Sequence, residues 1–175
     1  MKYNKKPYIV NTVRGDLPVI YCLFEASIKY QESKQFPSWR NYDRQAVEND
    51  VESRSQYKVV VDGTIAIVFT IRTEDAVIWR HHENGDAVYL HRIVVNPQFK
   101  GQRMFGHITD WAIEYCKQHG LKYVRMDTWA NNPNLIRYYC GFGFRFIENY
   151  TTPDTETLPV HNRNLPLALL ELEVS

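Results

Sequence analysis

The spacing of hydrophobic and polar positions predicts an alternating series of strands and helices along the whole chain. Leu17, Ile20, Phe24 and Ile28 recur at helical spacing and predict a first helix that ends near Gln31. Asp16 directly precedes this helix, where its carboxylate can cap the N–H groups of the first turn. Helices are also expected over Asp43–Arg54, from about Phe105 to His119 and from Asn132 to Cys140, and strands over Tyr8–Val13, Tyr57–Val61, Ile65–Ile71, Ala87–Val95, Leu121–Thr128, Phe144–Glu148 and Leu167–Val174.

A β-hairpin is the clearest local prediction. The dipeptide Asp62-Gly63 separates two apolar runs, and Asp-Gly tolerates the positive φ angles of a type I′ turn. The stretch Arg72–Asp86 is polar and is expected to be a loop. The order of the elements places a hairpin half before a β-α-β-α-β half. This order favours the α+β class, with a mixed sheet and helices on both faces.

Composition narrows the possible functions. The 175 residues and 20.7 kDa suit one domain, so residues 1–175 are expected to share a single core. The 21 basic residues nearly balance the 20 acidic ones, which argues against nucleic acid or a membrane surface as a partner. Aromatic residues, at 14%, are numerous enough to line a cleft as well as to fill a core.

The cysteines and the N-terminal segment indicate a cellular location. Cys22, Cys116 and Cys140 are odd in number and widely spaced, so they form neither a disulfide framework nor a Cys-x-x-Cys pair. Met1–Val13 is polar and basic, without the apolar stretch of a signal peptide. We therefore expect a cytoplasmic protein, and the choice between monomer and homodimer stays open.

Two segments carry candidate chemistry. The first, Val94–Gly106, lies between a strand and a helix N-terminus, where backbone N–H groups and the helix dipole favour a phosphate, and Lys100 and Arg103 add positive charge. An ordinary strand-to-helix loop with two glycines is the alternative. In the second segment Asn132-Pro133 fits the start of a helix, and Tyr139 follows seven residues later. Here the alternative is a simple cap and a core aromatic.

Taken together, the two segments resemble the GNAT superfamily of N-acetyltransferases, which transfer an acyl group from acyl-coenzyme A to an amine. The family pattern is a strand ending V-x-P, then R/Q-x-x-G-x-G/A before a helix, and one strand later N-x-x-A-x-x-x-Y-x-x-x-G-F. Val95-Asn96-Pro97 matches the first part. Asn132, Leu135 in the alanine position, Tyr139 and Gly143-Phe144 match the last part without a gap. The resemblance covers nearly the whole chain and is most specific over 89–146.

The resemblance implies one mixed, mostly antiparallel sheet of six to seven strands and acetyl-CoA as co-substrate. It places the cofactor against the end of one strand, the following loop and Asn132. The middle motif departs from the family: Lys100 stands in the Arg/Gln position, Arg103 replaces the first glycine and Phe105 the Gly/Ala. Because a side chain can obstruct backbone approach, the effect on coenzyme A affinity stays open. The implied cofactor residues are Ile93, Val94, Val95, Lys100, Gly101, Gln102, Arg103, Met104, Phe105, Gly106 and Asn132.

The resemblance also suggests roles in catalysis. A backbone N–H within Ile93–Val95 would polarise the thioester carbonyl, and Tyr139 would protonate the leaving thiolate. Alternation along Tyr89, His91, Ile93 and Val95 places His91 on the face that leads to the cofactor loop, where it could accept the proton of the amine directly or through water. An ordered water is the alternative base, and a satisfied strand histidine is the alternative role for His91.

The sequence gives less information about the acceptor than about the cofactor. The acceptor is expected to be a primary amine of a small molecule or peptide, with Tyr30, Phe36, Trp39 and Trp79 near its pocket. A non-catalytic acyl-CoA-binding sensor or interaction module with the same fold is the alternative function. No metal is expected, because the adjacent His81-His82 side chains should diverge and no spaced Cys or Asp accompanies them.

Overall fold

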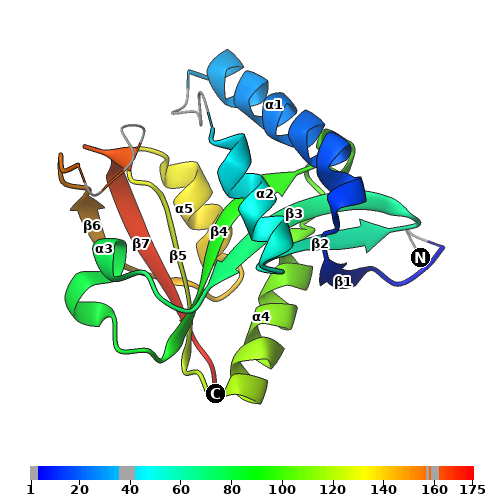
Figure 1. The fold of residues 1–175 in the computed structure, drawn as a ribbon. Coiled ribbons are helices and arrows are strands. Elements are labelled where there is room, and N and C mark those ends of the chain that lie inside the picture. The colour runs from blue at the N-terminus through cyan, green and yellow to red at the C-terminus, as the bar shows by residue number, and fades with distance from the viewer. Residues whose placement is uncertain (1–3, 36–41, 157, 159–161) are drawn as a thin grey trace. The chain divides into compact units, whose positions relative to one another are not determined.

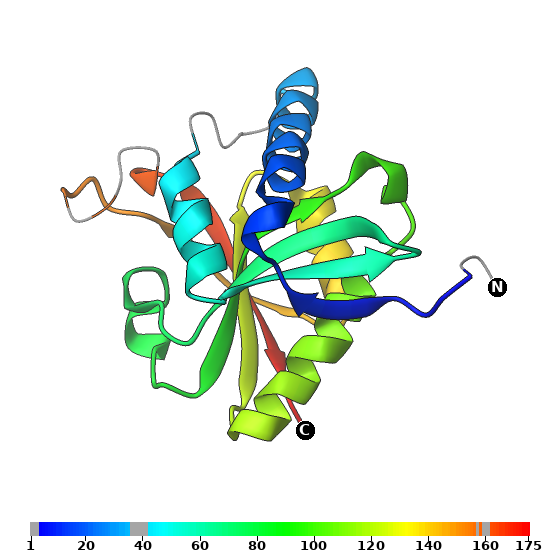
Figure 2. The ribbon, with the colours of Figure 1, turned by 45° about the vertical axis from the view of Figure 1, so that its right-hand side comes forward.

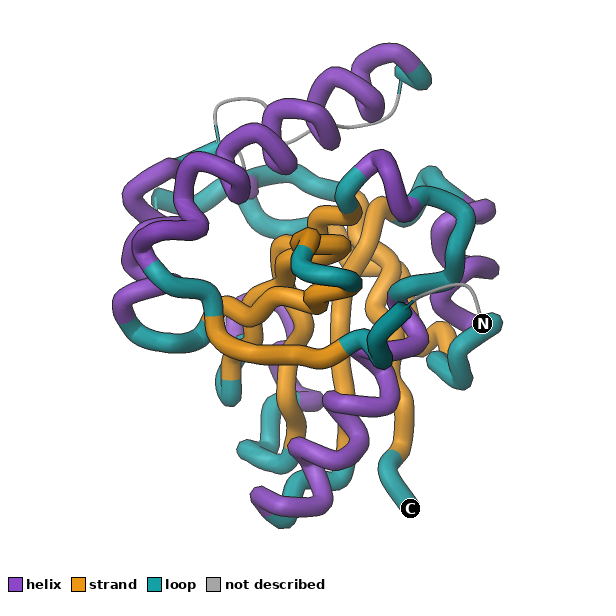
Figure 3. The backbone as a smooth tube through the Cα atoms, turned by 90° about the vertical axis from the view of Figure 1, so that its right-hand side faces the viewer, coloured by secondary structure: helices purple, strands orange, loops and turns teal. Residues whose placement is uncertain are grey.

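The computed structural model describes residues 4–35, 42–156, 158 and 162–175. Its seven strands form one mixed sheet in the order β1-β2-β3-β4-β5-β7-β6 (Figure 1). Figure 3 shows the strands in orange and the helices in purple. The strands are β1 Tyr8–Asn11, β2 Gln56–Val61, β3 Thr64–Arg72, β4 Ala87–Val95, β5 Tyr123–Trp129, β6 Arg145–Thr151 and β7 Pro166–Glu173. The helices are α1 Leu17–Ser33, α2 Arg44–Glu52, α3 Ala76–Trp79, α4 Phe105–His119 and α5 Pro133–Cys140, with 3-10 turns η1 Arg14–Asp16, η2 Arg80–His82 and η3 Pro97–Phe99.

The chain divides into two compact units. The first unit comprises Met1–Ile71 and His91–Trp111, and the second comprises Arg72–Leu90 and Ala112–Ser175. Strand β4 and helix α4 each contribute residues to both units. The sheet and its helices confirm the predicted α+β class, whereas the assignment of residues 1–175 to one domain stays a prediction.

The first unit is built on the β2–β3 hairpin, with β1 paired antiparallel to β2 (Figure 2). Asp62 and Gly63 have φ angles of 48° and 84°, as the predicted type I′ turn requires. Two neighbouring residues of β3 face opposite sides of the sheet, because successive strand side chains alternate. Val68 packs in one core with α1 and α2, whereas the Phe69 ring lies 5.3 Å from the Trp111 ring of α4. Helices therefore cover both faces, as predicted.

The second unit contains the parallel pair of β4 and β5 and the antiparallel pairs β5–β7 and β6–β7. Its core includes Trp79 and Tyr89, both fully buried. Arg125 lies beside them and donates to Glu171 Oε2 at 2.9 Å and to the Tyr89 hydroxyl at 3.1 Å. The buried guanidinium is thus paired, as a buried charge must be to avoid a large desolvation penalty.

Several local predictions need correction. Asp16 does not cap α1: its Oδ2 accepts from Val13 N–H at 2.8 Å and lies 2.6 Å from Lys58 Nζ, because η1 precedes the helix. The predicted loop at Arg72–Asp86 contains the short helix α3, capped by Asp75. The predicted strand Phe144–Glu148 is placed at Arg145–Thr151, and its residue Phe146 is 48% exposed, next to a register irregularity between β6 and β7. Among the residues described, no helix combines the length and apolar character needed to cross a membrane.

Candidate functional site

The loop that follows β4 is anchored to strand β3 by one asparagine. The Asn96 backbone N–H donates to Ala66 O and its Nδ2 donates to Ile65 O, both at 2.8 Å. Its Oδ1 accepts from the Gln98 N–H at 3.1 Å and so caps η3. The start of the predicted phosphate loop is therefore held in place within the first unit.

The loop keeps a left-handed backbone where the family glycine is replaced. Gly101 has φ 76° and Arg103 has φ 54°. The two side chains that follow are buried, Met104 at 3% and Phe105 at 1% exposure. Since the Phe105 ring lies in the interior, it does not cover the solvent side of the loop. Arg103 thus adopts a backbone conformation that favours glycine.

The end of the loop becomes the N-terminus of α4. Gly106 N–H donates to Arg103 O, and His107 N–H donates to Met104 O, both at 3.1 Å. The 15-residue helix directs the positive end of its dipole to this side. Lys100 is exposed, with its Nζ 3.4 Å from the centroid of the Tyr30 ring in α1. The loop therefore combines a helix N-terminus with the positive charges of Lys100 and Arg103.

The left-handed backbone at Arg103 leads to a stability prediction. Arg103→Gly should be more stable than Arg103→Ala by about 0.5–1 kcal/mol, because a Cβ is unfavourable in this conformation. Both variants remove the same charge, so urea unfolding isolates the backbone contribution. Equal stability of the two variants, or greater stability of the alanine variant, would contradict a left-handed residue at this position.

Strand β4 is not regular where it approaches the loop. Arg92 has φ 47°, which is outside the extended region. The side-chain alternation that aligned His91 with Ile93 assumes an extended backbone at Arg92, so that argument no longer holds. His91 and Ile93 are partly buried, and Val94 is fully buried in the core with α1 and α2. Strand alternation therefore no longer supports a role for His91 as the base.

The second unit holds the other predicted site residues, Asn132 and Tyr139. Asn132 caps α5 as expected, since its Oδ1 accepts from the Leu135 N–H at 3.1 Å. Tyr139 lies on α5 and is 9% exposed. Burial raises the pKa of Tyr139 well above its usual range, and Tyr138 and Asp127 raise it further. The Tyr139 hydroxyl consequently keeps its proton at neutral pH and can act as a donor.

A pair of carboxyl groups in the second unit was missed by the sequence analysis. Carboxylate oxygens of Asp75 and Asp127 lie within 4.8 Å of each other, and both residues are partly buried. Burial raises the pKa of Asp75 to about 6. Burial and then the Asp75 charge raise the pKa of Asp127 to about 7. The sequence offered one signal for this pair: Asp127 is an acidic residue in a predicted strand and directly follows the apolar Met126, which is buried.

The adjacent histidines do not diverge as predicted. The ring centroids of His81 and His82 are 4.0 Å apart, and Glu148 Oε1 lies 3.4 Å from His82 Nε2. The three side chains could supply metal ligands, but the Glu148 carboxylate already forms an ion pair with Arg80. The cation paired with Glu148 in this structure is therefore a guanidinium. That the protein needs no metal stays a prediction.

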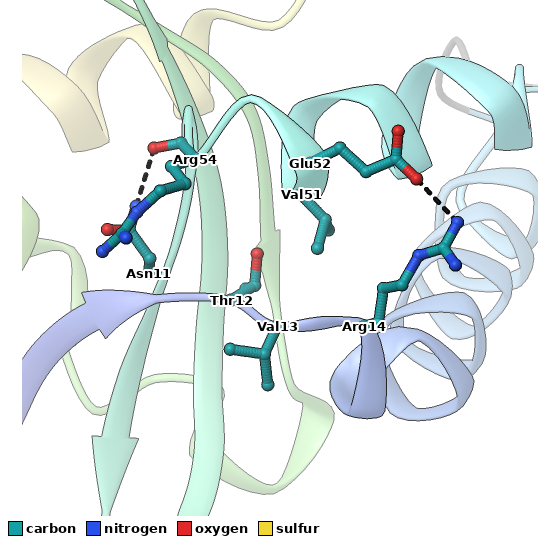
Figure 4. A pocket seen from close by; sticks show the side chains of 7 residues that line it. All are labelled: Asn11, Thr12, Val13, Arg14, Val51, Glu52 and Arg54. Atoms are coloured by element: carbon teal, nitrogen blue, oxygen red, sulfur yellow. Dashed lines mark hydrogen bonds and ion pairs between the residues drawn. The ribbon is translucent and has the colours of Figure 1, made fainter.

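A shallow pocket of about 430 Å³ lies in the first unit, between the end of β1 and the end of α2 (Figure 4). Asn11 Nδ2 donates to Arg54 O at 2.7 Å on one side, and Arg14 pairs with Glu52 at 2.6 Å on the other. The predicted site residues do not line it. The lining residues are Asn11, Thr12, Val13, Arg14, Val51, Glu52 and Arg54.

Residues 25–144 match the model of the acetyltransferase (GNAT) family. The chain belongs to this family. The resemblance inferred from the two motifs is thereby confirmed. The matched region contains the left-handed loop of the first unit as well as Asn132 and Tyr139 of the second.

Three known proteins similar to this GNAT chain share little sequence identity with it. The uncharacterized N-acetyltransferase YesJ of Bacillus subtilis (strain 168) is 26% identical over 73 residues, 42% of this chain and 41% of that protein. A GNAT acetyltransferase from Streptococcus agalactiae 2603 superposes with a TM-score of 0.77 at 16% identity, covering 99% and 98% of the two chains. The aminoglycoside acetyltransferase AAC(6')-Ib, solved with coenzyme A and kanamycin, has a TM-score of 0.71 at 14% identity, covering 96% and 95%. At these identities, the solved structures establish the fold.

Proposed function

We propose that this chain is an N-acetyltransferase that moves an acetyl group from acetyl-CoA to a primary amine of a small molecule or peptide. The observation that carries the proposal is the loop Lys100–Gly106. It has a left-handed residue at Arg103 and leads into α4 in a chain that matches the GNAT family. Backbone N–H groups at a helix N-terminus with two nearby cations suit the phosphates of coenzyme A.

The bound co-substrate would supply a thioester, and the chain would supply the groups that make it react. The amine nitrogen bonds to the carbonyl carbon, the carbon–sulfur bond breaks, and the sulfur leaves with the bonding pair. A backbone N–H of Ile93–Val95 would donate to the carbonyl oxygen as its negative charge develops. The Tyr139 hydroxyl would give its proton to the sulfur; its raised pKa means that this proton is present at neutral pH. No acyl-enzyme is needed.

Two groups are candidates for accepting the proton of the amine. His91 holds the position that the resemblance implies, and an imidazole with a pKa of about 6.5 can act as a base at neutral pH. The Asp75–Asp127 pair is the second candidate, because a carboxyl with a pKa of about 7 can also accept a proton there.

The predicted aromatic wall of the acceptor pocket needs revision. Trp79 is fully buried, with the Arg125 guanidinium 4.8 Å from its ring, so it cannot contact an acceptor. Tyr30 holds Lys100 instead of standing free. Phe36 and Trp39 lie outside the described residues. A primary amine remains the proposed acceptor class, supported by the kanamycin complex of a structural neighbour.

We also infer that the protein works in a reducing compartment such as the cytoplasm. Cys22, Cys116 and Cys140 are all free thiols. Burial raises the pKa of the Cys116 thiol to about 11, which makes it unreactive. Cys140 adjoins Tyr139 in sequence but is exposed, which fits a surface position better than a nucleophile in a closed site.

Calorimetry and a thiol-release assay test the proposed function. We expect acetyl-CoA to bind with a micromolar dissociation constant, and coenzyme A thiol to be released when a panel of primary amines is added. Absence of binding at millimolar acetyl-CoA would refute the cofactor assignment. Binding without transfer to any amine in the panel would favour the non-catalytic sensor.

A further inference from the structure

A non-glycine residue occupies the left-handed region in the middle of strand β4. Arg92 has φ 47° although β4 continues to Val95. This conformation brings the Cβ close to the backbone carbonyl and is disfavoured for any residue with a side chain. Such residues persist where the surrounding contacts determine the backbone, and they concentrate at functional sites. A contact of the Arg92 side chain is therefore expected to hold the backbone in place.

That contact is a buried carboxylate on helix α2. Arg92 Nε donates to Asp50 Oδ2 at 3.0 Å, and Arg92 Nη2 forms a second, shorter hydrogen bond with the same oxygen. The Asp50 side chain is only 2% exposed, whereas that of Arg92 is 33% exposed. The ion pair thus has one end fixed in the interior. Arg92 and Asp50 both belong to the first unit.

Asp50 is itself held in place by hydrogen bonds from strand β3 and from the residues that follow helix α2. The Thr70 hydroxyl of β3 donates to Asp50 Oδ2 at 3.0 Å. The Asp50 carbonyl accepts from the Ser55 N–H at 3.0 Å and from the Ser55 hydroxyl at 3.2 Å. Thr70 is fully buried, so its hydrogen bond to Asp50 is shielded from water. Asp50 is therefore a fixed point to which the side chain of Arg92 is tied.

The left-handed residue directly precedes Ile93–Val95, the segment that would donate to the thioester carbonyl. A left-handed residue within a strand turns the following N–H groups away from the regular ladder direction, as in a β-bulge. An oxyanion donor is effective only when it points to the position of the developing charge. The direction of these N–H groups therefore depends on the conformation of Arg92.

We propose that Asp50 is a positioning residue for acetyl transfer: by holding the Arg92 guanidinium it maintains the left-handed backbone that aims the N–H groups of Ile93–Val95 at the thioester carbonyl. This inference rests on the proposed function. Asp50 does not contact the reacting atoms; it acts through Arg92. The Arg92–Asp50–Thr70 set is called the β4 clamp below.

The test compares Asp50→Asn with the double variant Asp50→Asn/Arg92→Gly. Glycine adopts positive φ without a clamp, so the double variant should recover the geometry that the single variant loses. We expect Asp50→Asn to lower kcat about tenfold and to change the acetyl-CoA dissociation constant less than about threefold. The double variant should regain about a third or more of the wild-type kcat. Glu52→Gln is the matched control, because Glu52 lies two residues away on α2 in an exposed ion pair, and its kcat should stay within about twofold of wild type.

A second measurement needs no acceptor amine. Infrared difference spectra of acetyl-CoA labelled with ¹³C at the thioester carbonyl should show a shift to lower frequency on binding to the wild type. The shift should be smaller with Asp50→Asn and recovered in the double variant. If Asp50→Asn does not fold, Arg92→Lys carries the same expectations, because an ammonium cannot reproduce both guanidinium hydrogen bonds.

The outcomes separate the clamp from the proposed function. A carbonyl shift and kcat in Asp50→Asn equal to wild type would overturn the clamp and leave the acetyltransferase proposal standing. So would a double variant no better than Asp50→Asn. Failure of the wild type to bind acetyl-CoA would overturn the proposed function and the clamp with it.

Discussion

Replacing Tyr139 by phenylalanine should lower kcat by about 10²- to 10³-fold, the usual contribution of a general acid. Tyr139 is 9% exposed, and its pKa is raised by burial and by the nearby Tyr138 and Asp127, so its hydroxyl carries a proton at neutral pH. Phenylalanine keeps the ring and removes only this proton donor. Acetyl-CoA should therefore bind to the variant within about threefold of wild type, as measured by calorimetry.

The adjacent tyrosine provides a matched control for this experiment. Tyr138 lies on the same helix, α5, is 37% exposed, and its ring is 5.4 Å from that of Tyr139. Tyr138→Phe removes one hydroxyl from the same segment and should leave kcat within about threefold. The assignment of the acid fails if Tyr139→Phe retains full activity, or if the two variants lose activity equally.

Asp127→Asn should produce the second largest effect: lower turnover together with higher stability at alkaline pH. If the Asp75–Asp127 pair is the base, kcat should fall about 10- to 100-fold. The rise in kcat/KM of the wild type near pH 6–7 should also be lost, because the pKa of Asp127 is about 7 and that of Asp75 about 6. Initial rates between pH 5 and 9 measure both effects.

The stability change follows from the direction of the shift. The folded protein holds the Asp127 proton more tightly than the unfolded chain, whose aspartate pKa is about 3.9. The stability that Asp127 contributes is therefore fully present below about pH 4 and is lost as the pH rises through about 7. Asparagine has no charge to bury, so Asp127→Asn should be more stable than wild type by about 4 kcal/mol at pH 8 and equal to it at pH 4.

An exposed aspartate controls for the loss of a charge. Asp110 lies on α4 and is exposed, so Asp110→Asn should change neither the pH profile nor the stability difference between pH 4 and pH 8. Unchanged activity and pH profile in Asp127→Asn would exclude the carboxyl pair as the base. His91→Gln would then be the decisive variant. A stability gain without an activity loss would show that the buried Asp127 charge destabilises the fold but takes no part in catalysis.

In the predicted phosphate loop, Lys100–Gly106, the sequence and the structure give different information about the departures from the family pattern. Arg103 and Phe105 stand where the family has small residues, and the sequence therefore left the loop geometry open. In the structure Phe105 is buried and Arg103 adopts the left-handed conformation of a glycine. A motif records which residues are usual, whereas the backbone at one position depends on the contacts around it. The sequence alone therefore could not decide whether the two substitutions alter the loop.

Local periodicity and turn chemistry by themselves determined most of the elements. The helical spacing of Ile20 and Phe24, the Asp62-Gly63 turn and the Asn132 cap are each set by a few neighbouring residues, and all three occur as predicted. The motif from Val95 to Phe144 also sufficed to identify the family. Each of these features depends on a short stretch of chain, so hydrophobic spacing and turn or cap residues are enough to predict it.

Only the tertiary structure decided which distant side chains meet. The Asp75–Asp127 pair, the burial of Trp79 beneath Arg125, and the β4 clamp each join residues more than 40 positions apart. The left-handed conformation of Arg92 had no sequence signal, because arginine does not favour it as glycine does. Such pairings follow from the packing of whole elements. The sequence therefore specified the framework and the family, and the tertiary structure specified the charges and the backbone direction on which the proposed chemistry depends.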